Sequence, residues 1–235
     1  MTASLYRLML RSQLTRARVA GLLALGAVGI VTGLAIGSSE VVNHQLAGTR
    51  FIDTFGLALL APVATLIFAS AALGDPNEDG TLVYIWLRPV PRWRVVLAAI
   101  ASSITVTLPI VVGPLLVAAA VTGAGADLVR ATAVSASVAV VAYSAVFVAL
   151  GLRVKRALMW GLLYVLIWEG FVAQANSSAA RLAIRSYTRS LLSDIADVYL
   201  RLADVSFRAA WLVPLIAAIV AGGYATVRLT RQDVA

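Results

Sequence analysis

Six long runs without charged residues constrain this sequence more than any other feature. A helix that crosses a bilayer needs about 20 apolar residues, because the hydrocarbon core is about 30 Å thick. Windows of that size, the fifth interrupted only by Glu169, occur at Val19–Gly37, Thr54–Gly74, Val95–Val121, Ala131–Leu152, Ala157–Ala175 and Ala209–Val227. We therefore expect an all-α integral membrane protein, with six transmembrane helices in a single domain over residues 1–235.

Composition argues against a soluble enzyme or a nucleic-acid-binding domain. The chain is 61% apolar and 13% charged, whereas soluble domains average about 45–50% and about 25%. Its net charge is +8, but the basic residues lie between apolar runs and form no single basic face, so we expect no nucleic-acid partner. With no cysteine and one histidine, His44, we expect neither a thiol nucleophile nor a metal site.

The distribution of basic residues predicts the orientation in the membrane. Of the 19 Lys and Arg residues, 12 lie before the first span, in the second-to-third or fourth-to-fifth connection, or after the last span. Short cytoplasmic connections are enriched in Lys and Arg. We expect a multi-pass protein of the cell membrane with both termini cytoplasmic, whose first apolar run is a retained helix and not a cleaved signal. The opposite-side segment Asn176–Arg208 carries five further arginines.

Two connections are long enough to fold. On the cytoplasmic side, the acidic run Asp75–Gly80 is typical of a turn, and we expect a short helix over Glu78–Leu87 that Pro89 ends. In the outer segment, apolar residues recur at helical spacing, while Arg181, Arg185 and Arg189 step by four. We expect outer amphipathic half-helices that lie on the membrane or dip into its outer leaflet. The alternative is a solvated helix with no role in transport.

No motif for chemistry within the chain is present. A phosphate-binding G-x-x-x-x-G-K-[ST] loop is absent from the sequence. The run from Asp75 matches the first half of a calcium loop, but Trp86 occupies the position that requires a bidentate glutamate. We therefore expect no catalytic residue, no metal ligand and no cofactor in this chain, and any energy for work has to come from a partner.

Glu169 is the ionisable side chain well within a predicted span. At about 1.5 Å per residue from Ala157, it lies roughly 18 Å into the membrane. A charge at that depth is costly, so the side chain faces protein or water, or is protonated. It is a candidate for the translocation path, for outer-gate support or for proton transfer. The alternative is a structural role, in which it caps the outer helices or binds an arginine such as Arg181. Asp53, at the outer interface, is expected to be solvated.

Three glycines, Gly29, Gly33 and Gly37, form one stripe on the first span. Such stripes allow another helix to approach closely. That helix belongs either to this chain or to a second copy of it, and the sequence leaves both open.

The cytoplasmic connection supplies the most specific motif. Its residues are Glu78-Asp79-Gly80-Thr81-Leu82 followed by Leu87-Arg88-Pro89-Val90-Pro91-Arg92-Trp93-Arg94. This pattern resembles the signature of permease subunits of the ABC-2 type exporter family. The six-span layout, the Arg-rich N-terminal segment and Trp168-Glu169-Gly170 late in the fifth span are similar to that family over nearly the whole chain.

The resemblance implies a permease that works with a second permease and two ATP-binding subunits, which bind ATP and Mg²⁺. It implies that Glu78–Leu87 is a coupling helix, with an N-terminal interfacial helix over about Ser4–Arg18 beside it. Residues expected to contact the ATPase are Glu78, Asp79, Thr81, Leu82, Tyr84, Arg88 and Arg92. It further implies that the first and fifth spans line the permease dimer, with the Gly29, Gly33 and Gly37 stripe at the interface.

Two other classes remain open from the residues alone. A secondary transporter would use Glu169 as its proton carrier and would need no ATPase. A membrane scaffold would transport nothing and would bind another catalytic protein. The sequence does not identify the substrate, although the apolar spans are compatible with an amphipathic molecule.

Overall fold

The computed structural model describes residues 2–80 and 90–231, and all regular elements within these residues are helical. Six helices are long and apolar enough to cross a membrane. Their bounds are Arg16–Ser38, His44–Glu78, Arg92–Val121, Ala126–Arg153, Ala157–Ala175 and Phe207–Arg231. Each contains one of the six predicted windows, so within the described residues the expected helical fold and six candidate membrane-spanning helices are confirmed.

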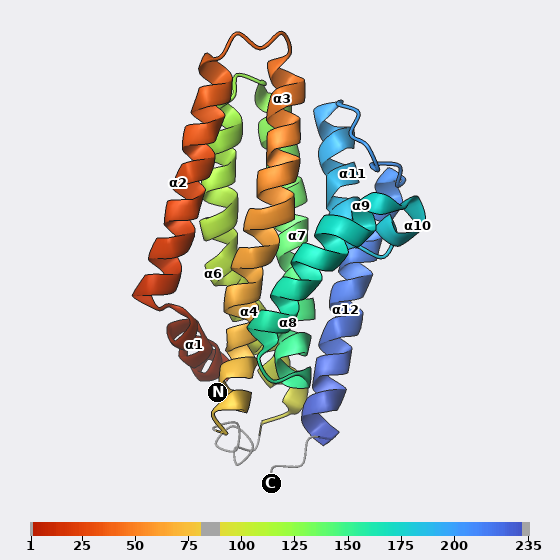
Figure 1. Ribbon diagram of the computed structural model, residues 1–235. Helices are drawn as coiled ribbons and strands as arrows, with labels where there is room; N and C mark the ends of the chain where they lie inside the picture. The colour runs from red at the N-terminus through yellow and green to blue at the C-terminus, as the bar shows by residue number, and fades with distance from the viewer. Residues whose placement is uncertain (1, 81–89, 232–235) are drawn as a thin grey trace.

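Figure 1 gives the arrangement of these helices. The single-element spans are α2 (Arg16–Ser38), α6 (Arg92–Val121), α7 (Ala126–Arg153) and α12 (Phe207–Arg231). The second span joins α3 (His44–Phe51), η1 (Ile52–Leu60) and α4 (Ala61–Glu78), and the fifth joins α8 (Ala157–Leu163), η2 (Tyr164–Val172) and α9 (Ala173–Ala175). The shorter helices are α1 (Thr2–Gln13), α10 (Ser177–Ala180) and α11 (Ile184–Ala196). We call the end of the bundle with α1 and the last turn of α12 the terminal end, and the opposite end the far end (Figure 1).

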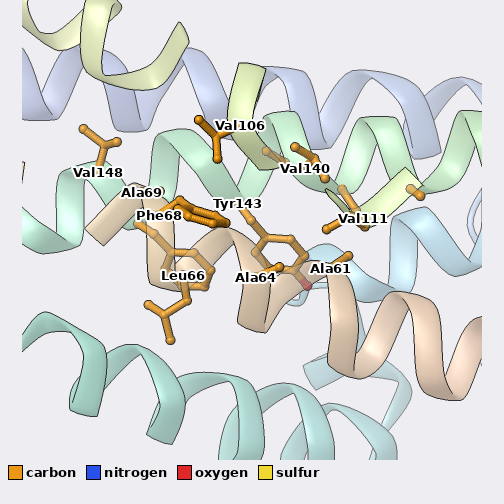
Figure 2. Close-up of a cluster of buried hydrophobic side chains, with 14 of the residues drawn as sticks. Ala61, Ala64, Leu66, Phe68, Ala69, Val106, Val111, Val140, Tyr143 and Val148 are labelled. Carbon is orange, nitrogen blue, oxygen red and sulfur yellow. The ribbon is translucent and has the colours of Figure 1, made fainter. Parts of the chain in front are cut away.

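Helix α7 lies at the centre and packs against α4, α6, α11 and α12. Its contact with α4 depends on small residues: a Cβ atom on Gly151 would lie 2.7 Å from the backbone oxygen of Ser70. Membrane helices associate through such close packing, because lipid tails are as apolar as the side chains. Figure 2 shows the neighbouring core, where Tyr143 of α7 lies among Ala61, Ala64 and Phe68 of α4.

The N-terminal helix ends earlier than the expected Ser4–Arg18. Helix α1 ends at Gln13, and α2 begins at Arg16 after Thr15, whose extended backbone (φ −92°, ψ 139°) interrupts the helix. The Gln13 Nε2 donates a hydrogen bond to Ser102 Oγ of α6 (2.9 Å). The buried Leu5 and Met9 add apolar contact, so α1 is fastened to the bundle along one face.

The expected turn at Asp75–Gly80 is wrong, because α4 remains helical through Glu78. Asp79 caps the helix and Gly80, with φ +67°, follows it. Polar residues of this last turn form hydrogen bonds to neighbouring segments, and these bonds accompany the helical conformation. For example, Arg18 Nη2 donates a hydrogen bond to Asp75 Oδ2 (3.1 Å). The rest of the expected helix Glu78–Leu87 lies outside the described residues.

Helix α11 is buried in the bundle, whereas the sequence predicted a helix that lies on the membrane or dips into its outer leaflet. Its first ten residues, Ile184–Ser193, are all buried, and it packs against α7 and α12. Its hydroxyl groups are satisfied locally, with Thr188 donating to the Arg185 carbonyl and Ser190 to the Ser186 carbonyl. A buried polar helix is stable only when its polar groups have partners, and its two buried arginines find theirs in Asp53.

Candidate functional site

Asp53 and Glu169 both lie in π-helical segments of their spans. In η1 the Ala61 N–H donates to the Gly56 carbonyl, and in η2 the Ala173 N–H donates to the Trp168 carbonyl. The π-helix is rare and occurs frequently at functional sites. The two segments pack against each other, so the chain brings both acids to one region of the bundle.

Asp53 forms the centre of a buried ion cluster, contrary to the expectation that it is solvated. Its Oδ2 accepts a hydrogen bond from Arg185 Nη2 at 3.1 Å, and its Oδ1 accepts one from Arg189 Nε at 2.9 Å. All three side chains are less than a tenth exposed. Asp53 is buried because α11 enters the far end of the bundle and presents two guanidinium groups, one helical turn apart, to this single carboxylate.

Charge in this cluster is not balanced by Asp53 alone. Arg189 makes two further hydrogen bonds, from Nη1 to Gln174 Oε1 and to the Arg201 carbonyl, each 3.2 Å. Arg185 Nε is buried and has no hydrogen-bond partner. Burial lowers the pKa of Arg185 and the neighbouring Arg189 adds to that shift, while Asp53 opposes it. Two buried guanidinium groups therefore share one directly bonded carboxylate, which favours an additional anion at this place.

Glu169 binds two phenols and, among the described residues, no arginine. Its carboxylate accepts hydrogen bonds from the hydroxyls of Tyr143 and Tyr164, the latter at 3.1 Å. The backbone N–H of Ile184, the first residue of α11, also interacts with it. Glu169 is 2% exposed, so it is shielded from lipid and water by groups that satisfy its oxygens.

These contacts can be compared with the structural role that the sequence left open for Glu169. The carboxylate faces the first N–H group of an outer helix, as capping requires, but Arg181 is not its partner. Arg181 is exposed, and its carbonyl accepts a hydrogen bond from the Tyr187 hydroxyl. Glu169 also lies within electrostatic range of Arg185, which links the tyrosine-bound carboxylate to the Asp53 cluster.

At the terminal end, the expected ATPase-contacting residues are described only in part. Glu78 Oε1 accepts a hydrogen bond from the Arg156 N–H at 2.6 Å, and Asp79 is exposed at the end of α4. Arg92 is the first residue of α6. The remaining expected residues, Thr81, Leu82, Tyr84 and Arg88, lie outside the described residues.

The glycine stripe of α2 packs within the chain. A Cβ atom on Gly29 would lie 2.5 Å from the Phe55 ring, and one on Gly33 would lie 2.6 Å from the backbone oxygen of Ala118. A Cβ atom on Gly37 would clash with the backbone oxygen of Val121. At these glycines α2 therefore contacts η1 and α6 of its own chain, which is the first of the two alternatives that the sequence left open. The expected interface with a second permease is not formed by this stripe.

The sequence did not identify Tyr143, Tyr164, Arg185 and Arg189 as members of a site. Nothing in the sequence distinguishes Tyr143 and Tyr164, because tyrosines in apolar runs are common core residues. The spacing of Arg185 and Arg189 was informative, because residues four apart lie on one face of a helix. Within residues 2–80 and 90–231, no group of three or more His, Asp or Glu side chains is arranged to hold a metal ion.

Searches with the whole sequence find no matching protein-family model and no matching curated protein.

Proposed function

We propose that this chain is the permease subunit of an ATP-driven exporter of the ABC-2 type. It pairs with a second permease of the same or a homologous sequence, and with two ATP-binding subunits that bind ATP and Mg²⁺. ATP binding and hydrolysis in those subunits move the segment that follows α4, and the permease pair alternates between inward-open and outward-open states. The cargo is unidentified and has an amphipathic character.

The observation that carries the proposal is the way the end of α4 is fixed to its neighbours. Asp75 binds Arg18 of α2 (3.1 Å), the Asn77 amide donates to the Gly151 carbonyl of α7 (3.4 Å), and Glu78 accepts from the N–H of Arg156, before α8. A displacement applied beyond Glu78 reaches three spans directly. A coupling segment needs such rigid connections, because coupling travels through packed and hydrogen-bonded elements.

Topology and sequence motif support the same function. The described ends of α1 and α12, the last turn of α4 and the first turn of α6 lie at the terminal end (Figure 1). Of the 12 basic residues that the sequence assigns to the cytoplasmic side, the 11 that the structure describes lie at this end, and we assign it to the cytoplasm. The described residues of the motif that resembles the ABC-2 signature, 78–80 and 90–94, lie at this end as well, and we propose that an ATP-binding subunit docks here.

Isolation of the protein from its native membrane in a mild detergent tests the proposal. We expect an ATP-binding subunit with a G-x-x-x-x-G-K-[ST] loop to co-purify, identified by mass spectrometry. The matched control is the exposed far-end variant Asp127→Ala, which should retain the same partner. Recovery of the intact permease without any ATP-binding protein, or with a different catalytic protein in fixed ratio, would contradict the proposal and favour a scaffold.

The buried Glu169 favours proton-coupled transport as the second candidate. Its two tyrosine donors suit a carboxylate that exchanges a proton, as well as one that holds α11 in place. Glu169→Gln and Glu169→Leu separate the two roles: a structural carboxylate tolerates Gln better than Leu, whereas a proton carrier tolerates neither. Transport that stops in a folded Gln variant and collapses with the proton gradient would establish the second candidate.

A further inference from the structure

We propose that the far end of the bundle holds an oxyanion-binding site that takes a phosphate group. The site is a cavity of about 520 Å³ between α3, η1, α11 and the segment that follows α11. Its polar lining consists of Arg50, Asp53, Thr54, Gln174, Arg185, Arg189, Tyr199 and Arg201. The inference concerns binding alone, and it stands independently of the proposed export function.

The charges around the cavity require a further anion. Four of the lining residues are arginines and one, Asp53, is acidic. Asp53 is already bonded to Arg185 and Arg189. Within residues 2–80 and 90–231, the guanidinium groups of Arg50 and Arg201 make no ion pair. Even when the nearby Glu169 is counted, positive charge remains in excess in a partly desolvated place, where its compensation is worth most.

The guanidinium groups of four arginines line the cavity and can bind such an anion. Arg185 is 7% exposed, and its Nε, which is fully buried, has no hydrogen-bond partner within the described residues. A buried donor without a partner costs free energy, so this guanidinium group is not fully satisfied by Asp53. Guanidinium groups bind phosphate and carboxylate through two parallel hydrogen bonds. Arg50 and Arg201 are exposed at the cavity, so their side chains have the freedom to close on a ligand.

The depth of the cavity matches the phosphate level of a bilayer. At about 1.5 Å per residue, the helical path from Asp53 to Asp75 rises roughly 30 Å, which is the thickness of the hydrocarbon core. Asp75 lies at the terminal end, so Asp53 lies near the opposite boundary. A cavity of this volume falls within the range of about 300–1,000 Å³ of small-molecule sites. The phosphate group therefore has two sources, a free anion or the headgroup of an amphipathic molecule.

Thermal unfolding of the purified full-length chain, followed by tryptophan fluorescence, measures binding to both sources. Inorganic phosphate is titrated at constant ionic strength against chloride, and dodecyl phosphate is titrated in neutral detergent micelles. Ligands that bind only the folded state raise the unfolding temperature, and the concentration dependence gives a Kd. Stabilisation by inorganic phosphate identifies a free-anion site, and stabilisation by dodecyl phosphate alone identifies a headgroup site.

Variants at the exposed arginines keep the buried cluster intact. We expect Arg50→Gln and Arg201→Gln each to weaken phosphate binding about tenfold, as loss of one charged hydrogen-bond donor implies. Arg130→Gln is the matched control, since Arg130 is an exposed arginine on α7 outside the cavity. No stabilisation by either ligand would overturn the site. Equal stabilisation of the Arg50→Gln/Arg201→Gln double variant and the Arg130→Gln control would also overturn it.

Discussion

Replacing Asp53 with asparagine tests the buried ion cluster directly. The change keeps the shape of the side chain and removes the charge that Arg185 and Arg189 share. Each guanidinium loses a charged acceptor at 3.1 or 2.9 Å, and one such bond is worth about 1.5–3 kcal/mol. Because both groups stay buried, we expect a loss of about 3–5 kcal/mol in the free energy of unfolding, as for other broken buried pairs.

The assay for Asp53→Asn is unfolding in mixed micelles by a denaturing detergent, followed by tryptophan fluorescence. Asp127→Asn is the matched control, because Asp127 pairs with Arg130 on the surface at 3.3 Å, with both side chains mostly exposed. Exposed pairs contribute about 0.2–1 kcal/mol, so the control should change little. A difference of less than about 1 kcal/mol between the two variants would refute the reasoning that the cluster is a desolvated, charge-paired element.

Three further predictions follow from other contacts. Tyr143→Phe removes the fully buried hydroxyl that donates a hydrogen bond to Glu169, and it should lower the free energy of unfolding by about 1–3 kcal/mol. Tyr164→Phe removes a partly buried donor to the same carboxylate and should lower it less, and unfolding titrations of the two variants compare these losses. Gly33→Ala places a methyl group 2.6 Å from a backbone oxygen of α6 and should destabilise by about 1–3 kcal/mol, whereas Gly21→Ala, with nothing within 4 Å, should be neutral or slightly stabilising. A cysteine at Asp79, in a chain that has none, should be labelled by an impermeant reagent only after the cells are opened, and labelling of intact cells would reverse the topology.

The spans were predictable because length and hydropathy act locally. A run of about 20 apolar residues meets the thickness of the bilayer wherever it lies in the chain, and each predicted window lies within an observed helix. Helix ends were harder to predict, since neighbours decide them. The last turn of α4 contains Pro76 and three polar residues, Asp75, Asn77 and Glu78, that are typical of a turn, yet contacts with Arg18, Gly151 and Arg156 accompany its helical form.

The ion cluster could not be predicted, because its members are far apart in the sequence. Asp53 lies 132 residues before Arg185 and 136 before Arg189, and nothing local marks them as partners. The spacing of the arginines was visible, but an amphipathic arginine face is typical of a membrane surface as well as of a buried ion cluster. For Glu169, depth in the span predicted burial, while the tyrosine donors depend on how α7 and η2 pack.

We propose above that the segment that begins at the end of α4 couples the chain to an ATP-binding subunit. The most direct test is the rate of ATP hydrolysis by the co-purified complex that carries Asp79→Ala/Tyr84→Ala/Arg88→Ala. Glu78 stays unchanged because it binds the Arg156 N–H, and the matched control is the far-end triple variant Glu40→Ala/Asp127→Ala/Arg130→Ala.

We expect permease-stimulated ATP hydrolysis to fall about tenfold in the Asp79/Tyr84/Arg88 variant, an apparent change of about 1.4 kcal/mol, and to be unchanged in the far-end control. Equal stimulation by the two folded variants, or no stimulation by the unaltered chain, would contradict this expectation.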